Sequence, residues 1–386
     1  MHDTPDFAVS DAELRAAGSL KWAVAGPDVL PAWVAEMDVR PCPPVTRALH
    51  EAVGRGTFGY LPPPSTLRLP ETCAAFVTAR FGLPVDPRQI VLSGDVMGGI
   101  RLVLDTVCEP APVIVPLPTY PPFLSVVPLT GRVAVPVAAV SDGDRMVLDL
   151  DGIARALAEG ARTVLLSQPH NPLGRVFSEA ELTGLRDLVL RHGARVISDE
   201  IHAPLVLPGV RHLPYAAIEG TAGHVTTLVS ASKAWNMPGL KSAQIIAGSA
   251  EDLAARQAVP FIANHGTSPL GAVAATAAYE HGGPWLDGVL GHLAAQRDRF
   301  SALLATHLPD LSWQPPEATY LAWVDARPTG LDDPAGAAHE VGRVLLSDGA
   351  DFGPGYAGFV RINLATSAER LERIVQGLAH AWTAAG

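Results

Sequence analysis

Hydrophobic and polar positions over residues 163–199 follow a pattern that predicts a strand, a helix and a second strand. Residues 163–167 (TVLLS) form a short, continuous apolar run, which is typical of a fully buried strand. Ser178 and Glu181 have the spacing of a capping box, in which the two side chains satisfy free N–H groups at the start of a helix. Residues 195–199 (RVISD) then form a second apolar run. This order predicts a β-α-β unit in a parallel sheet, with the loops that carry chemistry at the C-terminal ends of the strands.

The rest of the chain continues this α/β pattern, which then changes after about residue 270. Further apolar runs and stripes predict strands over 86–93, 225–229, 244–247, 319–324 and 358–363, a helix over 101–107, and a closing helix with Leu371, Ile374, Leu378 and Trp382 on its inner face. The change of pattern predicts a large domain over 45–270 and a small domain formed by 1–44 and 271–386. The expected fold class is α/β, with a mostly parallel sheet in the large domain and a smaller α/β domain beside it.

Composition limits the partners that this fold can have. The chain has 386 residues, of which 48% are hydrophobic and 17% charged, so it can bury a large core. Its formal net charge of −11 argues against nucleic acid or an anionic membrane as a partner, because both require a basic surface. No leader-like segment opens the chain, and prolines interrupt every apolar run before it could span a bilayer. The three cysteines include no CxxC pair and the histidines show no metal spacing, so we expect a cytoplasmic protein without a metal site.

Unusual polar residues follow three of the predicted strands. Asn171 comes after the first strand, Asp199 ends the next, and Lys233 follows a third. Because the C-terminal ends of parallel strands meet at one edge of a sheet, these side chains are expected to lie together. A glycine-rich loop over 94–99 that opens a helix would add backbone N–H donors for a phosphate.

This set of groups matches the chemistry of pyridoxal 5'-phosphate. The Lys233 amine can form a Schiff base with the aldehyde, and the Asp199 carboxylate can keep the ring nitrogen protonated, so that the ring acts as an electron sink. Asn171 can donate to the phenolic oxygen of the ring. Tyr120, in the segment PTYPPF, can stack on the face of the ring. Each signal alone is weak, but four of them converge on one edge of the sheet.

Motifs along essentially the whole chain also resemble one known family. They read WVAEMDVRP, FGY, PTYPPF, PHNPLGRVF, SDEIHAPLV, SASKAWNMPGLKSA, TYLAWVD and GFVRINLA. In this order they are similar to the fold type I pyridoxal phosphate enzymes of the class I/II aminotransferase superfamily. Within that superfamily the chain looks like the cystathionine β-lyases of MalY and PatB type.

The resemblance assigns roles residue by residue. Lys233 matches the Schiff-base lysine that also moves the substrate Cα proton, and Arg361 matches the arginine that clamps the substrate carboxylate. The cofactor-binding residues that it implies are Val96, Met97, Tyr120, Asn171, Asp199, His202, Ser230, Ser232 and Lys241, with Asn171 and Tyr120 also near the substrate. Tyr60 matches a tyrosine that reaches the phosphate of a neighbouring subunit, which implies a homodimer with shared sites. His202 as a structural histidine, Tyr60 as a core aromatic and Lys241 as a solvated helix-end lysine remain open alternatives.

Departures from the family pattern keep more than one reaction open. Asp95 lies in the phosphate loop and is expected to point away from the phosphate, while Leu173 and Pro204 replace more usual residues. The resemblance implies a C–S β-lyase that cleaves cystathionine or a related cysteine S-conjugate to a thiol, pyruvate and ammonia. The alternatives are an aminotransferase and an enzyme that processes the S-conjugate by oxidative decarboxylation or deamination. A non-catalytic regulatory protein is disfavoured by the joint presence of Lys233, Asp199 and Arg361.

Overall fold

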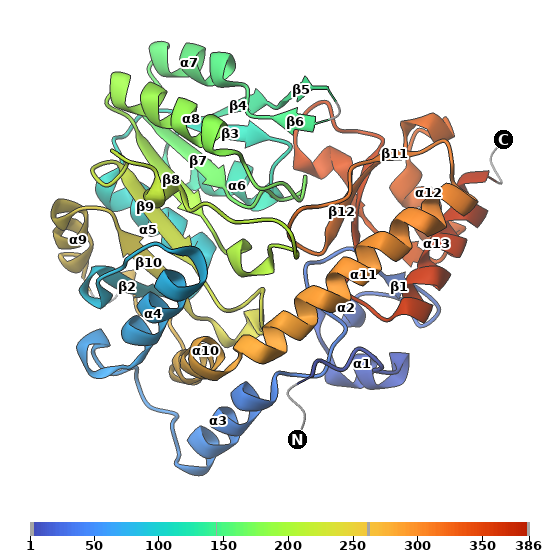
Figure 1. Cartoon of the computed structure of the whole chain (residues 1–386), viewed down its shortest axis with the longest axis horizontal. Coiled ribbons are helices and arrows are strands. Elements are labelled where there is room, and N and C mark those ends of the chain that lie inside the picture. The colour runs from blue at the N-terminus through green and yellow to red at the C-terminus, as the bar shows by residue number, and fades with distance from the viewer. Residues whose placement is uncertain (1–3, 144, 261–262, 384–386) are drawn as a thin grey trace.

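The fold was described from a computed structural model that covers residues 4–143, 145–260 and 263–383. It is an α/β architecture with one large mixed sheet and one small antiparallel sheet, and Figure 1 shows the two sheets side by side. The predicted fold class is confirmed. No helix within the described ranges is long and apolar enough to cross a membrane.

The large sheet carries the five strands predicted between residues 86 and 247, together with β3 and β4, which were not predicted. Within the described residues its seven strands are, in spatial order, β2 (Ile90–Ser93), β10 (Ala243–Ala247), β9 (Val225–Val229), β8 (Arg195–Asp199), β7 (Thr163–Ser167), β3 (Val113–Leu117) and β4 (Ala134–Ala138). The pairs from β9 to β4 are parallel, whereas β10 is antiparallel to both of its neighbours. The chain therefore leaves β9 at the C-terminal edge of the parallel strands and returns directly through β10. The loop that contains Lys233 is this connection.

Helices cover both faces of the large sheet because its strands are apolar on both sides. Val164 and Leu166 of β7 pack in the cluster that contains α7 (Leu150–Ala158) and α8 (Glu179–Arg191). The intervening Leu165 packs on the opposite face with α5 (Val96–Val107) and α6 (Pro121–Val126). This alternation is the period of two that a strand imposes on its side chains. The predicted capping box is present at α8, where Ser178 and Glu181 bond each other's backbone N–H groups.

The C-terminal third of the chain forms the small sheet and its helices. The strands in spatial order are β11 (Ser312–Trp313), β12 (Leu321–Asp325), β15 (Phe359–Asn363) and β14 (Ser347–Asp348). The closing helix α13 (Ala368–Thr383) buries Leu371, Ile374, Leu378 and Trp382, as its stripe predicted. The division into domains at residues 44/45 and 270/271 stays a prediction.

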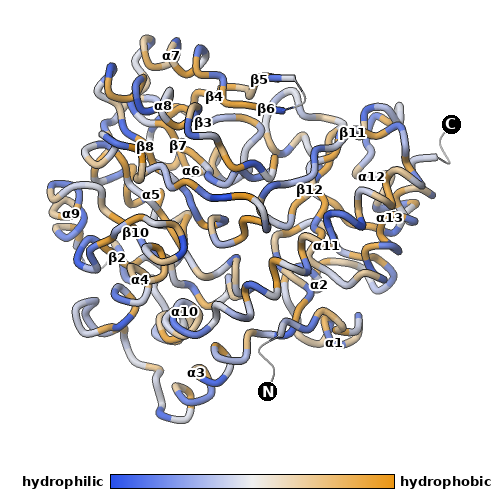
Figure 2. The backbone as a smooth tube through the Cα atoms, viewed as in Figure 1, coloured by the Kyte–Doolittle hydropathy of each residue, from blue (hydrophilic) through white to orange (hydrophobic). Residues whose placement is uncertain are grey.

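The remaining elements lie around these two units. They are the helices α1 (Asp11–Ala17), α2 (Leu20–Ala23), α3 (Pro43–Gly54), α4 (Leu69–Phe81), α9 (Ala250–Gln257), α10 (Pro269–His281), α11 (Gly283–His307) and α12 (Pro334–Glu340), and the strands β1 (Leu30–Pro31), β5 (Val140–Asp142), β6 (Arg145–Val147) and β13 (Val344–Leu345). β1 pairs in parallel with β13, so the N-terminal segment is joined to the C-terminal unit. In Figure 1 the blue helices α1 and α2 accordingly lie beside orange and red elements. Figure 2 shows hydrophobic residues concentrated along the strands of the large sheet.

Candidate active site

A cavity of about 290 Å³ opens where β7, β8 and β9 end. Most residues predicted for the site line it: Val96, Met97, Tyr120, Asn171, Asp199, His202, Ser230, Ser232, Lys233 and Lys241. The shared edge of three parallel strands explains this convergence, because each strand delivers its following loop to the same place. Ligand sites of open α/β sheets lie in this position.

Lys233 follows β9 and points its amine at the N-terminal segment. Its Nζ donates to the carbonyl oxygen of Ala35 over 2.9 Å. Burial lowers the pKa of Lys233 to about 8, and the positive charge of Arg361 lowers it further in the same direction. A minor fraction of the amine is therefore unprotonated at neutral pH, far more than for an ordinary lysine, and the unprotonated form is the one that a nucleophile or general base requires.

Asp199 is the last residue of β8 and is buried at the wall of the cavity. One carboxylate oxygen accepts the N–H of Ile201 over 3.0 Å. Burial raises the pKa of Asp199 to about 7, and the negative charge of Glu200 adds to this rise against the opposing effects of the Ile201 hydrogen bond and Lys233. A cation placed beside this carboxylate would reverse the shift. The site thus suits a ring nitrogen that carries a proton.

Arg361, on β15 of the small sheet, contacts Asn171, which lines the cavity. Its Nη1 donates to Asn171 Oδ1 over 3.1 Å, and its Nη2 donates to the carbonyl of Trp33 and to Ser347 Oγ over 2.9 and 3.2 Å. None of these partners in the described chain is a carboxylate, and the guanidinium is almost fully buried. Burial lowers the pKa of Arg361 to about 10, so the group stays cationic at neutral pH. A buried arginine of this kind is suited to the carboxylate of an amino acid.

The other end of the cavity is formed by the start of α5 and the loop after β9. Ser230 Oγ donates to the Ser242 carbonyl over 2.7 Å and lies 3.0 Å from Ser232 Oγ. Gly94 lets the chain approach closely, because a Cβ there would lie 2.8 Å from the carbonyl oxygen of Gly266. Hydroxyl groups and the start of a helix together suit a phosphate.

Asp95 forms two polar contacts at this end of the cavity. Its Oδ1 accepts the N–H of Gly98 over 2.7 Å, and its Oδ2 lies 2.9 Å from Lys241 Nζ. Burial raises the pKa of Asp95, but the bonds from Gly98 and Lys241 outweigh it and leave the pKa lowered. The carboxylate caps α5 and lies beside a predicted phosphate ligand, and its direction relative to a bound phosphate stays a prediction. Lys241 is therefore ion-paired and is not simply a solvated lysine.

His202 and Tyr120 complete the wall of the cavity. Burial lowers the pKa of His202 to about 3, with a further contribution from Lys233, so the imidazole is neutral. Its Nδ1 is buried without a hydrogen-bond partner among the described residues. Burial raises the pKa of Tyr120 and keeps the phenol protonated. The ring-binding roles of both residues stay predictions.

The sequence analysis did not predict Ser167, Ile201, Pro238 and Ser242, which line the cavity. Three further contributors were missed as well. They are the backbone carbonyls of Trp33 and Ala35, and Tyr320, whose hydroxyl donates to the Ala35 carbonyl over 2.9 Å. A backbone carbonyl has no sequence signal, since every residue has one. Tyr320 lies in the motif TYLAWVD, which could have drawn attention to it.

Tyr60 lies outside the cavity within one chain. Its side chain is 90% exposed, and Phe58 beside it is also exposed. The alternative interpretation of Tyr60 as a core aromatic is therefore wrong. Its contact with a second subunit stays a prediction.

The residues that converge on the cavity fit pyridoxal phosphate as a set. The cavity offers an amine for the aldehyde, a buried carboxylate for the ring nitrogen, an amide for the phenolic oxygen, and hydroxyl and ammonium groups at the start of a helix for the phosphate. In the described ranges, no three or more His, Cys, Asp or Glu side chains gather as a metal site would require.

Comparisons with known proteins agree with this geometry. The family model for aminotransferase class I and II matches residues 34–378. The chain is 38% identical to a cystathionine β-lyase of Corynebacterium glutamicum over 95% of this chain and 97% of the relative. A candidate PLP-dependent β-cystathionase from Corynebacterium diphtheriae superimposes with a TM-score of 0.93 at 37% identity, over 97% of this chain and 98% of that one. The PLP-bound C–S lyase of Staphylococcus hominis gives a TM-score of 0.89 at 26% identity, over 96% and 97% of the two chains.

Proposed function

Because the chain belongs to the aminotransferase class I and II family, we propose that it is a pyridoxal phosphate-dependent C–S β-lyase that cleaves cystathionine or a related cysteine S-conjugate. The observation that carries the proposal is the convergence of Lys233 and Asp199 on one cavity, with Arg361 bound to Asn171 in the wall of that cavity. These groups provide a base, a partner for a cationic ring and a carboxylate clamp. The cystathionine β-lyase and C–S lyase among the relatives support the same reaction class.

The cofactor would be held by residues from both ends of the cavity. Asp199 would pair with its ring nitrogen, and Ser230, Ser232 and Lys241 would bind its phosphate. Asn171 uses its oxygen to accept Arg361, which leaves its Nδ2 group as a donor to the ring oxygen. When bound, pyridoxal phosphate supplies an electron sink for the charge that develops at the substrate Cα.

The substrate would be oriented by Arg361 and deprotonated by Lys233. Two parallel hydrogen bonds from the guanidinium to the α-carboxylate would fix the amino acid. The Lys233 amine, with its pKa lowered to about 8, accepts the Cα proton. The neutral His202 adds no charge near that amine.

The overall reaction balances with water as the only co-reactant. The Cβ–S bond breaks, and the sulfur leaves with the electron pair and takes up a proton to form a thiol. Hydrolysis of the three-carbon remainder gives pyruvate and ammonia. No oxidant and no keto acid is consumed.

Product analysis tests the proposal. The purified protein loaded with pyridoxal phosphate should release pyruvate from L-cystathionine without an added keto acid, in an assay coupled to lactate dehydrogenase. Lys233→Ala should abolish this release. Formation of product only when a keto acid is supplied would replace the lyase by an aminotransferase.

A homodimer in the cytoplasm belongs to the same proposal. The exposed Phe58 and Tyr60 side chains support a partner surface near the segment FGY. Sedimentation of the wild-type protein at twice the mass of one chain, and a shift toward monomer in Tyr60→Ala, would test it.

A further inference from the structure

Residues 33–37, hereafter the strap, line the cavity at Ala35, and every backbone carbonyl of the strap is bound by a side chain. The acceptor and donor pairs are Trp33 with Arg361 and Ser347, Val34 with Asn363, Ala35 with Lys233 and Tyr320, Glu36 with Asn363 and Lys21, and Met37 with Asn236. Two of these donors, Lys233 and Arg361, belong to the proposed catalytic machinery. In the cofactor-free protein the strap therefore contacts both groups, and it contacts Arg361 through the Trp33 carbonyl.

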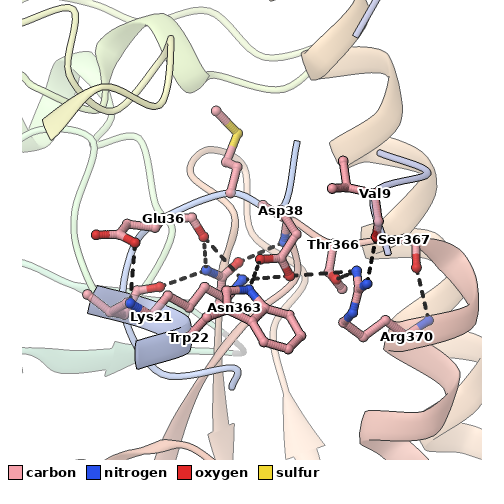
Figure 3. Close-up of polar contacts among 12 residues, drawn as sticks. Val9, Lys21, Trp22, Glu36, Asp38, Asn363, Thr366, Ser367 and Arg370 are labelled. Atoms are coloured by element: carbon pink, nitrogen blue, oxygen red, sulfur yellow. Dashed lines mark hydrogen bonds and ion pairs between the residues drawn. The ribbon is translucent and has the colours of Figure 1, made fainter. Parts of the chain in front are cut away.

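Behind the strap, an ion pair is buried away from the cavity. Lys21 Nζ lies 2.9 Å from Asp38 Oδ2, and both side chains are only 1% exposed. The same Nζ donates to the Glu36 carbonyl over 3.2 Å, two residues before Asp38. Trp22 Nε1 donates to Asp38 Oδ1 over 2.7 Å (Figure 3). Lys21 thus links α2 to the C-terminal end of the strap.

The C-terminal unit holds the strap from its other side. Asn363, on β15, donates through Nδ2 to the carbonyls of Val34 and Glu36 over 2.7 and 2.6 Å. Arg370, on α13, lies 3.9 Å from Asp38 and stacks over Trp22 (Figure 3). The strap is therefore fixed between two segments that are far apart in the sequence.

A role in fold stability alone does not account well for the Lys21–Asp38 pair. The desolvation of two buried charges offsets much of their attraction, so such a pair contributes little net stability compared with apolar residues of similar size. The pair does constrain geometry, because the Lys21 ammonium group must contact both the Asp38 carboxylate and the Glu36 carbonyl. That requirement fixes the backbone at Glu36, next to the carbonyl of Ala35 that binds Lys233.

We propose that Lys21 and Asp38 are positioning residues that hold the strap against Lys233 and Arg361 and thereby set the affinity for the amino acid substrate. This inference rests on the proposed function for the identity of the substrate. Neither residue touches the cavity, so both act through the strap.

The test uses the protein loaded with pyridoxal phosphate and three variants. Lys21→Met removes the ammonium group, and Lys21→Met/Asp38→Asn removes both charges while an amide oxygen remains for Trp22 Nε1. The double variant leaves no unpaired buried charge from this pair and is the one expected to fold if Lys21→Met does not. Arg40→Met is the matched control, since Arg40 lies in the same segment but forms its ion pairs with Asp6 and Glu13 on the surface.

Two measurements separate a positioning role from a structural one. We expect Lys21→Met and the double variant to raise KM for L-cystathionine at least tenfold, with pyridoxal phosphate affinity within twofold of the wild type. The control should leave both values within twofold. A lower Tm with unchanged KM at a temperature below unfolding would overturn the inference.

A binding experiment keeps the inference separate from the proposed function. α-Methylcysteine lacks a Cα hydrogen, so it can bind without losing a Cα proton, and its titration is followed by the absorbance of the cofactor. A tenfold weaker dissociation constant in the two Lys21 variants supports the positioning role even if the wild type releases no pyruvate. Equal dissociation constants in all four proteins would refute it, even if the wild type is an active lyase.

Discussion

The carboxylate of Asp95 lies 2.9 Å from the amine of Lys241, at the end of the cavity that suits a phosphate. An incoming phosphate must share Lys241 with this carboxylate and lie close to its negative charge. The pair is about half exposed, so solvent weakens the repulsion but does not remove it.

Asp95→Asn is therefore expected to bind pyridoxal phosphate more tightly, by about three- to tenfold, as for a partly screened pair. The amide can still accept the N–H of Gly98 and cap α5. Equilibrium titration of the cofactor-free protein measures the change. Asp105→Asn is the control because it removes the same charge from the same helix outside the cavity. Weaker binding in Asp95→Asn would mean that Asp95 holds Lys241 in place for the phosphate.

Asp95 also shows which features of the site could be predicted from the sequence and which could not. The strands, the capping box of α8 and the gathering of Asn171, Asp199 and Lys233 were predictable, because strand order and apolar periodicity determine which loops meet. The partner of Asp95 was not, because it depends on a turn 146 residues away in the chain.

The contacts of the strap could not be predicted from the sequence for a different reason. The carbonyls of Trp33 and Ala35 act through their position and not through their side chains. Sequence patterns report side chains, so a backbone acceptor becomes visible only when the chain path is known. The antiparallel direction of β10 was missed in the same way, since a buried apolar run reads alike in both directions.

A covalent link between Lys233 and the cofactor can be tested by reduction. Treatment of the loaded protein with borohydride should attach a pyridoxyl group to the peptide that contains Lys233, because an amine with a pKa lowered to about 8 is available for Schiff-base formation. Peptide mass analysis locates the label. Lys233→Ala should carry no label and should lose the yellow absorbance of the holoenzyme, whereas Lys241→Ala should keep the label at Lys233. A label on another lysine in the wild type would remove Lys233 from its role.

The stability of the cofactor-free protein should depend on Asp199 in a pH window set by its pKa. Between the ordinary pKa of 3.8 and the raised pKa of about 7, the folded state holds a proton on Asp199 that the unfolded chain has released. The free energy of unfolding therefore falls as pH rises through this window. Asp199→Asn removes this cost. Each pKa unit corresponds to about 1.4 kcal/mol, so the variant should gain up to a few kcal/mol over the wild type from pH 4 to pH 7.

Urea unfolding of the two cofactor-free proteins across this range provides the measurement. Asp187→Asn, at an exposed carboxylate on α8, should follow the wild type at every pH. Parallel curves for wild type and Asp199→Asn would show that the carboxylate is not held in the protonated form. Addition of pyridoxal phosphate should stabilise the wild type more than Asp199→Asn, because only the carboxylate can pair with a cationic ring.

Arg361 should control substrate binding more than cofactor binding. Arg361→Ala removes a buried cation whose partners in the described chain are neutral oxygens, so the loss falls on the incoming carboxylate. A charge-assisted pair of hydrogen bonds is worth about 2–3 kcal/mol, which corresponds to a rise in KM of roughly 30- to 150-fold. Arg361→Lys retains the charge but not the two parallel donors and should give an intermediate KM.

Steady-state pyruvate release measures the effect on substrate binding, and cofactor titration measures the effect on pyridoxal phosphate binding. Arg327→Ala, at an exposed arginine of the same unit, serves as the control. If Arg361→Ala weakens pyridoxal phosphate binding as much as substrate binding, Arg361 organises the cofactor through Asn171 and is not the carboxylate clamp.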